Sequence, residues 1–307
     1  MYQSTFNIKA KAPFDFDLSC RIFSSGDKSI KKYANNRLWQ AFTIKDKTIL
    51  LYIESVGSVD DPELKISVES DTELSQDILN SVPPIVYRIF NLGLDLNPFY
   101  EQMKSDPILA PITGRLYGLK NPSTPTLFEA LVDSIIEQQI SLKAAHSIEN
   151  RLIKYVGRSV HLYGQDYYSY PSPEDLTGLD LEKLRSCGLS HKKAEYIHDL
   201  AIEIVEKNVN LQSIQKMNTT TEMVEELTKI RGIGVWTAEM ALLRGLCRLD
   251  AIPADDVSLQ RVIGNFYGAD EKISSEKIRE IAISWGKWKG LASYYLIVAE
   301  LMKFRVN

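Results

Sequence analysis

Residues Leu227 to Asp256 read LTKIRGIGVWTAEMALLRGLCRLDAIPADD and contain a short glycine turn, Gly232-Ile233-Gly234, between two segments of helical periodicity. Two glycines allow positive φ angles and let a phosphate group come close to the backbone. The helix expected to start at Val235 presents free N–H groups, which are suited to binding an anion. The turn is therefore either a phosphate-binding hairpin or a structural helix–turn–helix corner with a glycine cap.

Two adjacent acids, Asp255 and Asp256, close this stretch about one helix and one loop after Trp236. Pro253 restricts the loop before them, and a new helix is predicted to begin at Val257. An Asp directly before a helix is commonly its N-cap. A carboxylate beside a phosphate-binding hairpin is also a candidate for chemistry on DNA, so both interpretations stand at this point.

The N-terminal part of the chain is predicted to form an antiparallel sheet. Two of its segments, residues 6–10 and 64–68, alternate between apolar and polar residues, and turn signals separate the segments, as expected for strands with one solvated face. The expected strands are residues 6–10, 41–44, 48–53 and 64–68, the second and third forming a hairpin. A helix is predicted over residues 73–90, interrupted or restarted at Pro83-Pro84.

Helical periodicity dominates beyond Thr126, with apolar residues recurring at intervals of three and four. Breaker clusters at Asn97-Pro98 and at residues 121–125 precede this change. The predicted fold class is α+β, with an N-terminal antiparallel sheet domain with helices over residues 1–112. An all-α domain over residues 113–307 follows it.

Composition and charge exclude several classes of protein. The chain of 307 residues is 44% apolar and 25% charged, which is ordinary for a globular protein. Cys20, Cys187 and Cys247 are far apart, which excludes a zinc knuckle or an iron–sulfur cluster. The net charge of −4 argues against coating DNA nonspecifically, although a small DNA footprint remains compatible with it. We expect no membrane span and no secretory signal.

The chain resembles the helix-hairpin-helix DNA glycosylase superfamily, and within it the alkylated-base branch of 3-methyladenine DNA glycosylase II. The hairpin with Trp236 and the PADD segment carry the resemblance. Three further segments agree with it in order: APFDF at 12–16, the run from Phe128 to Ser141, and LRSCGLS at 184–190 with Lys193-Ala194. The resemblance implies that the all-α domain has two helical lobes with the active site in the cleft between them.

The resemblance also implies the reaction. It predicts a monofunctional DNA glycosylase that hydrolyses the N-glycosidic bond of flipped-out alkylated purines, such as 3-methyladenine, and so initiates base excision repair. Asp256 aligns with the catalytic Asp of the family, which leaves Asp255 as a cap or neighbour. Relatives that nick DNA carry a lysine where this chain has Trp236, so no lyase activity is expected.

Other residues are assigned by the same resemblance. Gln139 and Ile140 match the turn that wedges into the DNA, although Ile140 could equally be a core residue. The base-binding positions are Trp236, Met240 and Ile297. The backbone-binding positions are Arg231, Gly232, Gly234 and Val235, and Arg231 replaces the usual proline.

No cofactor is expected for the chemistry. The resemblance implies that a structural Na⁺ or K⁺ would be held by the backbone carbonyls of Thr228, Ile230 and Ile233. The expected partner is double-stranded DNA containing a damaged base, bound by a monomer in the cytoplasm at the nucleoid. Two alternatives remain: the same fold acting on deaminated or oxidised purines, and a helix-hairpin-helix protein that binds DNA without cleaving it. Asp256 argues against the second.

Overall fold

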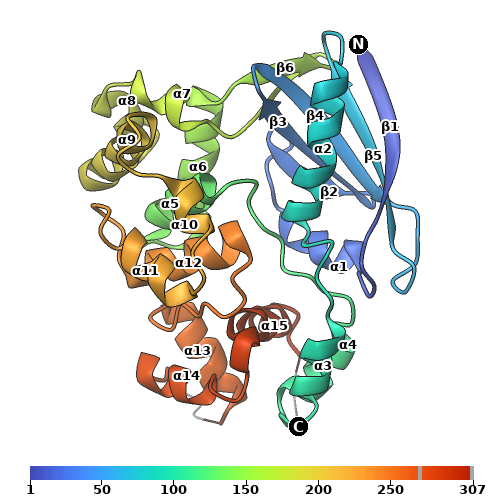
Figure 1. The fold of residues 1–307 in the computed structure, drawn as a ribbon, viewed down its shortest axis with the longest axis vertical. Helices are drawn as coiled ribbons and strands as arrows, with labels where there is room; N and C mark the ends of the chain where they lie inside the picture. The colour runs from blue at the N-terminus through green and yellow to red at the C-terminus, as the bar shows by residue number, and fades with distance from the viewer. Residues whose placement is uncertain (269–271, 305–307) are drawn as a thin grey trace.

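The computed structural model describes residues 1–268 and 272–304, and its architecture confirms the α+β fold class. A five-stranded antiparallel sheet lies on one side of the molecule and most of the helices on the other (Figure 1). The sheet has the order β1-β5-β4-β3-β2. Its strands are β1 (Tyr2–Lys9), β2 (Lys31–Ala34), β3 (Arg37–Ile44), β4 (Lys47–Ser55) and β5 (Glu63–Ser70).

The predicted hairpin is confirmed, because β3 and β4 pair antiparallel with Ile44 opposite Lys47. Helix α2 (Gln76–Ile89) packs on the sheet through a buried ridge of Ile78, Val82, Val86 and Ile89. The expected interruption at Pro83 and Pro84 is wrong, since α2 continues through both. Pro84 is exposed and Pro83 only half-buried, so the buried ridge holds the helix where two backbone hydrogen bonds are missing.

The remaining helices form two groups with separate apolar cores. The upper group comprises α5 (Leu127–Glu137), α6 (Leu142–Val156), α7 (Pro173–Thr177), α8 (Leu181–Ser186), α9 (His191–Val205), α10 (Leu211–Gln215), α11 (Thr220–Leu227) and α12 (Val235–Leu246). The lower group comprises α13 (Val257–Phe266), α14 (Ser275–Ile281), η2 (Gly286–Trp288) and α15 (Lys289–Leu301). Two short elements, α1 (Phe16–Cys20) and η1 (Arg21–Phe23), lie beside the sheet.

Two helices that come early in the chain belong to the lower core. Leu96, Phe99 and Met103, from α3 (Asn97–Met103) and the residue before it, share a cluster with Trp285 and Tyr295. Helix α4 (Leu109–Arg115) packs directly against α15. Figure 1 shows α3 and α4 beside α15 at the bottom of the molecule, away from the sheet. The lower helical group is therefore built from both halves of the sequence.

A two-stranded ribbon was not predicted, and the helical region is therefore not entirely helical. It consists of β6 (Ser159–Leu162) and β7 (Gln165–Tyr168), paired antiparallel. Val160, Leu162 and Tyr167 pack on Ala41 and Leu50 of the sheet. The ribbon thus connects the helical region to the outer face of the N-terminal sheet.

In the described part of the chain, no helix has the length and apolarity that crossing a membrane requires.

Candidate active site

The glycine hairpin joins α11 to α12, as the sequence predicts. Gly232 has φ +88°, and a Cβ atom there would lie 2.3 Å from Cγ of Tyr196 on α9. Gly234, the N-cap of α12, has φ −92°, so the expectation of positive φ is wrong for this glycine. Within the described residues, a Cβ atom on Gly234 would meet only open space. Gly232 therefore shapes the turn, while Gly234 leaves the N-terminus of α12 accessible.

Arg231 is exposed but already paired with helix α9. Its guanidinium donates to Asp199 at 2.7 Å and to Glu195 at 2.8 Å, and it lies over the Tyr196 ring at 5.4 Å. A phosphate contact by Arg231 therefore competes with two carboxylates in the free protein. Its predicted role in DNA binding stays a prediction.

Asp256 is held by two hydrogen bonds, and the catalytic role that the resemblance implies for it stays a prediction. It is the N-cap of α13, and its Oδ1 accepts a hydrogen bond from the backbone N–H of Leu259 at 2.8 Å. Its Oδ2 accepts a hydrogen bond from Nε1 of Trp236 at 3.3 Å. Capping orients the half-buried carboxylate, and the second oxygen faces the hairpin helix.

Asp255 points elsewhere and is exposed. Its Oδ2 lies 4.0 Å from Nη2 of Arg279 on α14, whose guanidinium also donates to the buried Glu239 at 3.0 and 3.3 Å. Burial raises the pKa of Glu239, and the Arg279 contact opposes that rise. Of the two adjacent acids, Asp256 is the one that contacts Trp236.

Met240 and Ile297, the other predicted base-pocket residues, are half-buried. Met240 follows Trp236 by one helical turn on α12, so the two share a helix face. Ile297 lies on α15 and packs against the core of the lower helical group. These two positions belong to different helical groups, and their assignment to the base pocket stays a prediction.

The predicted wedge turn connects α5 to α6 and stands out from the surface. Gln139 is exposed with φ +56°, a left-handed conformation that is unusual for a residue with a side chain. Ile140 is 38% exposed, which excludes the alternative that it is a core residue. The turn therefore presents both side chains to solvent.

Sequence reasoning missed two residues that hold this turn. Nε2 of Gln138 donates to the carbonyl of Gly232 and to Oγ1 of Thr237, both at 3.0 Å. Nζ of Lys193 donates to the carbonyls of Ile136 at 2.8 Å and Gln138 at 2.6 Å. Lys193 belongs to the segment that carries the family resemblance, which was the available signal. Nothing in the sequence alone pairs Gln138 with the hairpin, because the contact joins elements 94 residues apart.

The carbonyls predicted to hold a monovalent cation lie in the hairpin itself. The carbonyl of Ile230 already accepts a hydrogen bond from the N–H of Ile233 at 3.1 Å. Among the residues described, the structure contains no cluster of His, Cys, Asp or Glu side chains suited to a metal ion. A cation at Thr228, Ile230 and Ile233 would have neutral carbonyl oxygens as its protein ligands, a donor set compatible with Na⁺ or K⁺.

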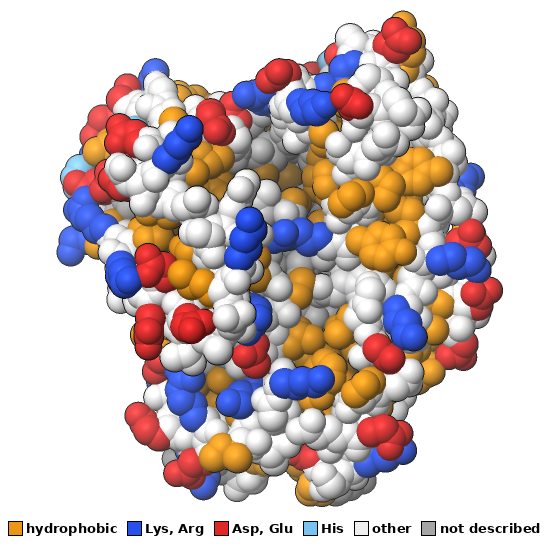
Figure 2. Space-filling view, viewed as in Figure 1, with side chains coloured by type: hydrophobic (Ala, Val, Ile, Leu, Met, Phe, Trp, Pro, Cys, Tyr) orange, Lys and Arg blue, Asp and Glu red, His pale blue; other side chains and the backbone are white. Residues whose placement is uncertain are grey.

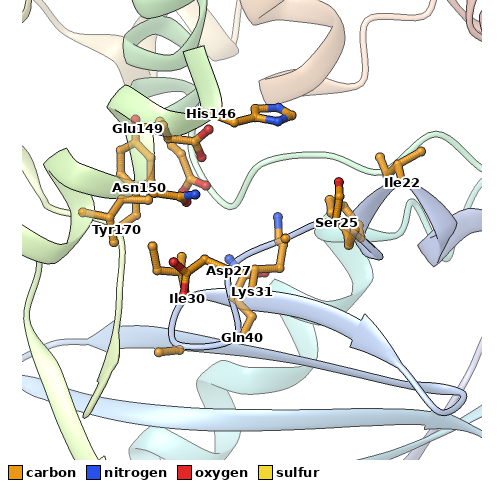
Figure 3. Close-up of a pocket in the computed structure, with 15 residues that line it drawn as sticks. Ile22, Ser25, Asp27, Ile30, Lys31, Gln40, His146, Glu149, Asn150 and Tyr170 are labelled. Carbon is orange, nitrogen blue, oxygen red and sulfur yellow. The ribbon is translucent and has the colours of Figure 1, made fainter. Parts of the chain in front are cut away.

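A cavity of about 140 Å³ lies away from these residues, between the sheet and α6. Figure 3 shows Lys31 and Gln40 from the strands facing His146 and Glu149 of α6. Glu129 also lines it, and burial raises the pKa of Glu129 to about 7. None of the predicted site residues lines this cavity, so we place the candidate active site at the hairpin and Asp256 instead.

Positive charge gathers locally in spite of the net charge of −4. Figure 2 shows a hollow between the helices on the left and the sheet region on the right, with Lys and Arg side chains along it. Such a distribution can attract a polyanion without an overall basic chain.

A protein-family model matches residues 132–287, which include the hairpin and Asp256, and its description is "HhH-GPD superfamily base excision DNA repair protein". The DNA-3-methyladenine glycosylase of Bacillus subtilis is 32% identical over 244 residues, covering 76% of this chain and 80% of that protein.

Two solved structures share the fold over almost the whole chain. The 3-methyladenine DNA-glycosylase from Archaeoglobus fulgidus has a TM-score of 0.84 at 24% identity, covering 97% of this chain and 99% of its own. The 8-oxoguanine glycosylase/lyase of Clostridium acetobutylicum, in complex with double-stranded DNA, has a TM-score of 0.75 at 20% identity, with the same coverages of 97% and 99%. Both matches include the N-terminal sheet.

Proposed function

Because the chain belongs to the HhH-GPD superfamily of base excision DNA repair proteins, we propose that the Trp236–Asp256 pair is the centre of a DNA glycosylase for alkylated bases. The substrate is double-stranded DNA containing a damaged purine such as 3-methyladenine, and the product is an abasic site. The single observation that carries the assignment is the contact of the hairpin helix with the capping carboxylate. Capping uses only one oxygen of the Asp256 carboxylate, and the second oxygen, which faces Trp236, is the part that supports a catalytic role.

Base release begins with eversion of the nucleotide, because the N-glycosidic bond is inaccessible in the stacked duplex. Unstacking costs a few kcal/mol, and least for damaged or mispaired bases. Gln139 and Ile140 are placed to fill the vacated position, since the turn exposes both. The open N-terminus of α12 beyond Gly234 binds the phosphate backbone beside the lesion.

Cleavage places positive charge on the deoxyribose. The carboxylate of Asp256 stabilises that charge and orients the attacking water. Its Oδ1 is held by Leu259 and its Oδ2 by Trp236, so the group is oriented before the substrate arrives. The Trp236 ring is suited to stack on an alkylated base, because such a base is electron-poor and positively charged.

The reaction ends with hydrolysis and not with strand cleavage. A Schiff-base nucleophile needs an amine, and an indole cannot supply one. We therefore propose a glycosylase without lyase activity that needs no cofactor and acts as a monomer at the nucleoid in the cytoplasm. The fold that the chain shares with an 8-oxoguanine glycosylase/lyase does not change this choice, because Trp236 occupies the lysine position.

Release of free bases tests the proposal directly. Purified protein is incubated separately with DNA that contains methylated, deaminated or oxidised purines, and the supernatant of each reaction is separated chromatographically. Release of 3-methyladenine or 7-methylguanine supports the function. Release of hypoxanthine or 8-oxoguanine alone would move the assignment to deaminated or oxidised purines, and no release from any substrate would favour a non-catalytic binder.

A further inference from the structure

The wedge turn adopts a conformation that needs support from its surroundings. Gln139 has φ +56°, and a residue with a side chain persists there only when neighbouring contacts hold it. Within the turn itself, the N–H of Ile140 donates to the carbonyl of Glu137 at a long 3.4 Å. The strain must therefore be offset by contacts with other elements.

Gln138 and Lys193 supply those contacts from two directions. The amide of Gln138 reaches across to the hairpin, where it donates to Gly232 and Thr237. The ammonium of Lys193, on α9, donates to two carbonyls, that of Ile136 in the last turn of α5 and that of Gln138 just after α5. Lys193 is half-buried, and desolvation lowers its pKa.

Helix α9 supports the wedge turn and the hairpin together. Lys193 holds the wedge turn, while Glu195 and Asp199 pair with Arg231 of the hairpin. Tyr196 lies against Gly232. One helix therefore sets the separation between the group that would enter the DNA stack and the group that would bind its backbone.

We propose that Gln138 and Lys193 are positioning residues that lock the wedge turn to the hairpin, so that binding of the DNA backbone and eversion of the base occur as one step. The inference rests on the proposed glycosylase function. It assigns neither residue a contact with the reacting atoms. Thr237, the second acceptor of Gln138, directly follows Trp236, so the lock also joins the wedge to the base-stacking residue.

The matched test compares Gln138→Leu and Lys193→Met with Lys192→Met, which removes the same charge from the exposed neighbouring residue. Single-turnover base release is measured on two DNAs, one with the lesion fully paired and one with the lesion in an unpaired bulge. We expect about a tenfold loss on paired DNA for the two positioning variants, the effect of one charged or buried hydrogen bond. On bulged DNA the loss should be less than about twofold, because eversion there costs little.

Lys193→Arg provides the conservative comparison, since it keeps a cationic donor, and it should recover most of the paired-DNA activity. Lys192→Met should match the wild type on both DNAs. Equal losses on paired and bulged DNA, or no loss on paired DNA, would overturn the inference.

A second readout separates this inference from the proposed function. Binding is followed with DNA that carries an abasic-site analogue opposite 2-aminopurine, whose fluorescence rises when the wedge disturbs its stacking. Wild type and Lys192→Met should raise the signal, and Gln138→Leu should raise it much less at saturating protein. If the wild type releases no base, the proposed function fails. Even then the 2-aminopurine fluorescence tests the positioning role of Gln138 and Lys193. Equal fluorescence from the wild type and all variants would refute that role.

Discussion

Nε1 of Trp236 donates a hydrogen bond to Oδ2 of Asp256 at 3.3 Å, although the two residues belong to helices joined by a long loop. The loop is held in place at both ends. The N–H of Gly290 donates to the carbonyl of Leu249 at 2.7 Å, and Nε2 of Gln260 donates to the carbonyl of Ala254 at 2.9 Å. The contact between indole and carboxylate therefore follows from the packing of the upper and lower helical groups.

Trp236→Phe keeps an aromatic ring for stacking but removes the donor to Asp256. We expect kcat to fall about tenfold with a smaller change in KM, because the carboxylate loses one of its two orienting contacts. Steady-state kinetics on alkylated DNA would measure both constants. A change confined to KM would show that the ring binds the base and that its N–H has no part in the chemistry.

Asp256→Asn should abolish base release, lowering its rate by about a hundredfold or more. This is the scale on which an enzyme loses rate when one electrostatic contact to the transition state is removed. Asn caps helices about as well as Asp, so the free energy of unfolding should change by less than about 1 kcal/mol. DNA binding, measured by fluorescence anisotropy, should stay within about twofold of the wild type. Asp255→Asn is the matched control and should retain activity; inactivity of that variant alone would reassign the catalytic acid.

Borohydride trapping should give no covalent adduct with alkylated DNA. Trapping requires a Schiff base between an amine and the sugar, and the indole of Trp236 cannot supply that amine. The reaction is analysed by denaturing electrophoresis, with a glycosylase/lyase as the positive control. A shifted band for this protein would mean that another amine attacks the sugar.

Gly232→Ala should destabilise the protein by about 2–4 kcal/mol, because a left-handed backbone is costly for Ala and the new methyl group displaces Tyr196. Gly234→Ala should cost about 1 kcal/mol or less, since its φ of −92° suits any residue. Chemical denaturation separates the two. DNA affinity should nevertheless fall for Gly234→Ala, because the methyl group occupies the open approach to α12. Equal affinity to the wild type would place the phosphate elsewhere.

Glu129 should make stability depend on pH. Burial raises its pKa from 4.5 to about 7 in the folded protein. Below pH 4.5 both folded and unfolded chains carry the proton, and the full contribution to stability is present. Between pH 4.5 and about 7 the unfolded chain loses its proton first, so stability falls by up to about 1.4 kcal/mol per pH unit.

Glu129→Gln should reduce that dependence and make the protein more stable than the wild type near pH 8, while Asp133 and Glu149, whose pKa values burial also raises, keep part of it. The exposed Glu225→Gln serves as the control and should leave the profile unchanged. Urea denaturation at a series of pH values gives the profile. A wild-type profile that rises between pH 5 and 7 would contradict the assignment of this group.

The sequence predicts those parts of the fold that depend on local pattern. Alternation located β1 and β5, and the glycine turn located the break between α11 and α12. The ribbon of β6 and β7 escaped prediction because its strands have only four residues each and are stabilised by packing on the sheet. The continuity of α2 through two prolines likewise comes from its buried ridge, which local propensity does not register.

The candidate site divides in the same way. Asp256 and Gly232 could be proposed as site residues from spacing and resemblance, because each stands in an ordered motif. The choice between Asp255 and Asp256 gains a structural reason only from their contacts, because Asp256 accepts from Trp236 whereas Asp255 lies near Arg279. Gln138 could not be assigned a role from the sequence, since its partners lie in a distant segment.

The packing of α4 against α15 has a consequence for how the chain is made. A ribosome releases residues 97–115 long before residues 289–301, yet both contribute to one apolar core. The early helices must therefore wait, with Phe99 and Leu109 uncovered, until α15 has emerged. The sheet can form first, whereas the core of the lower helical group is completed only after residues 289–301 have been made.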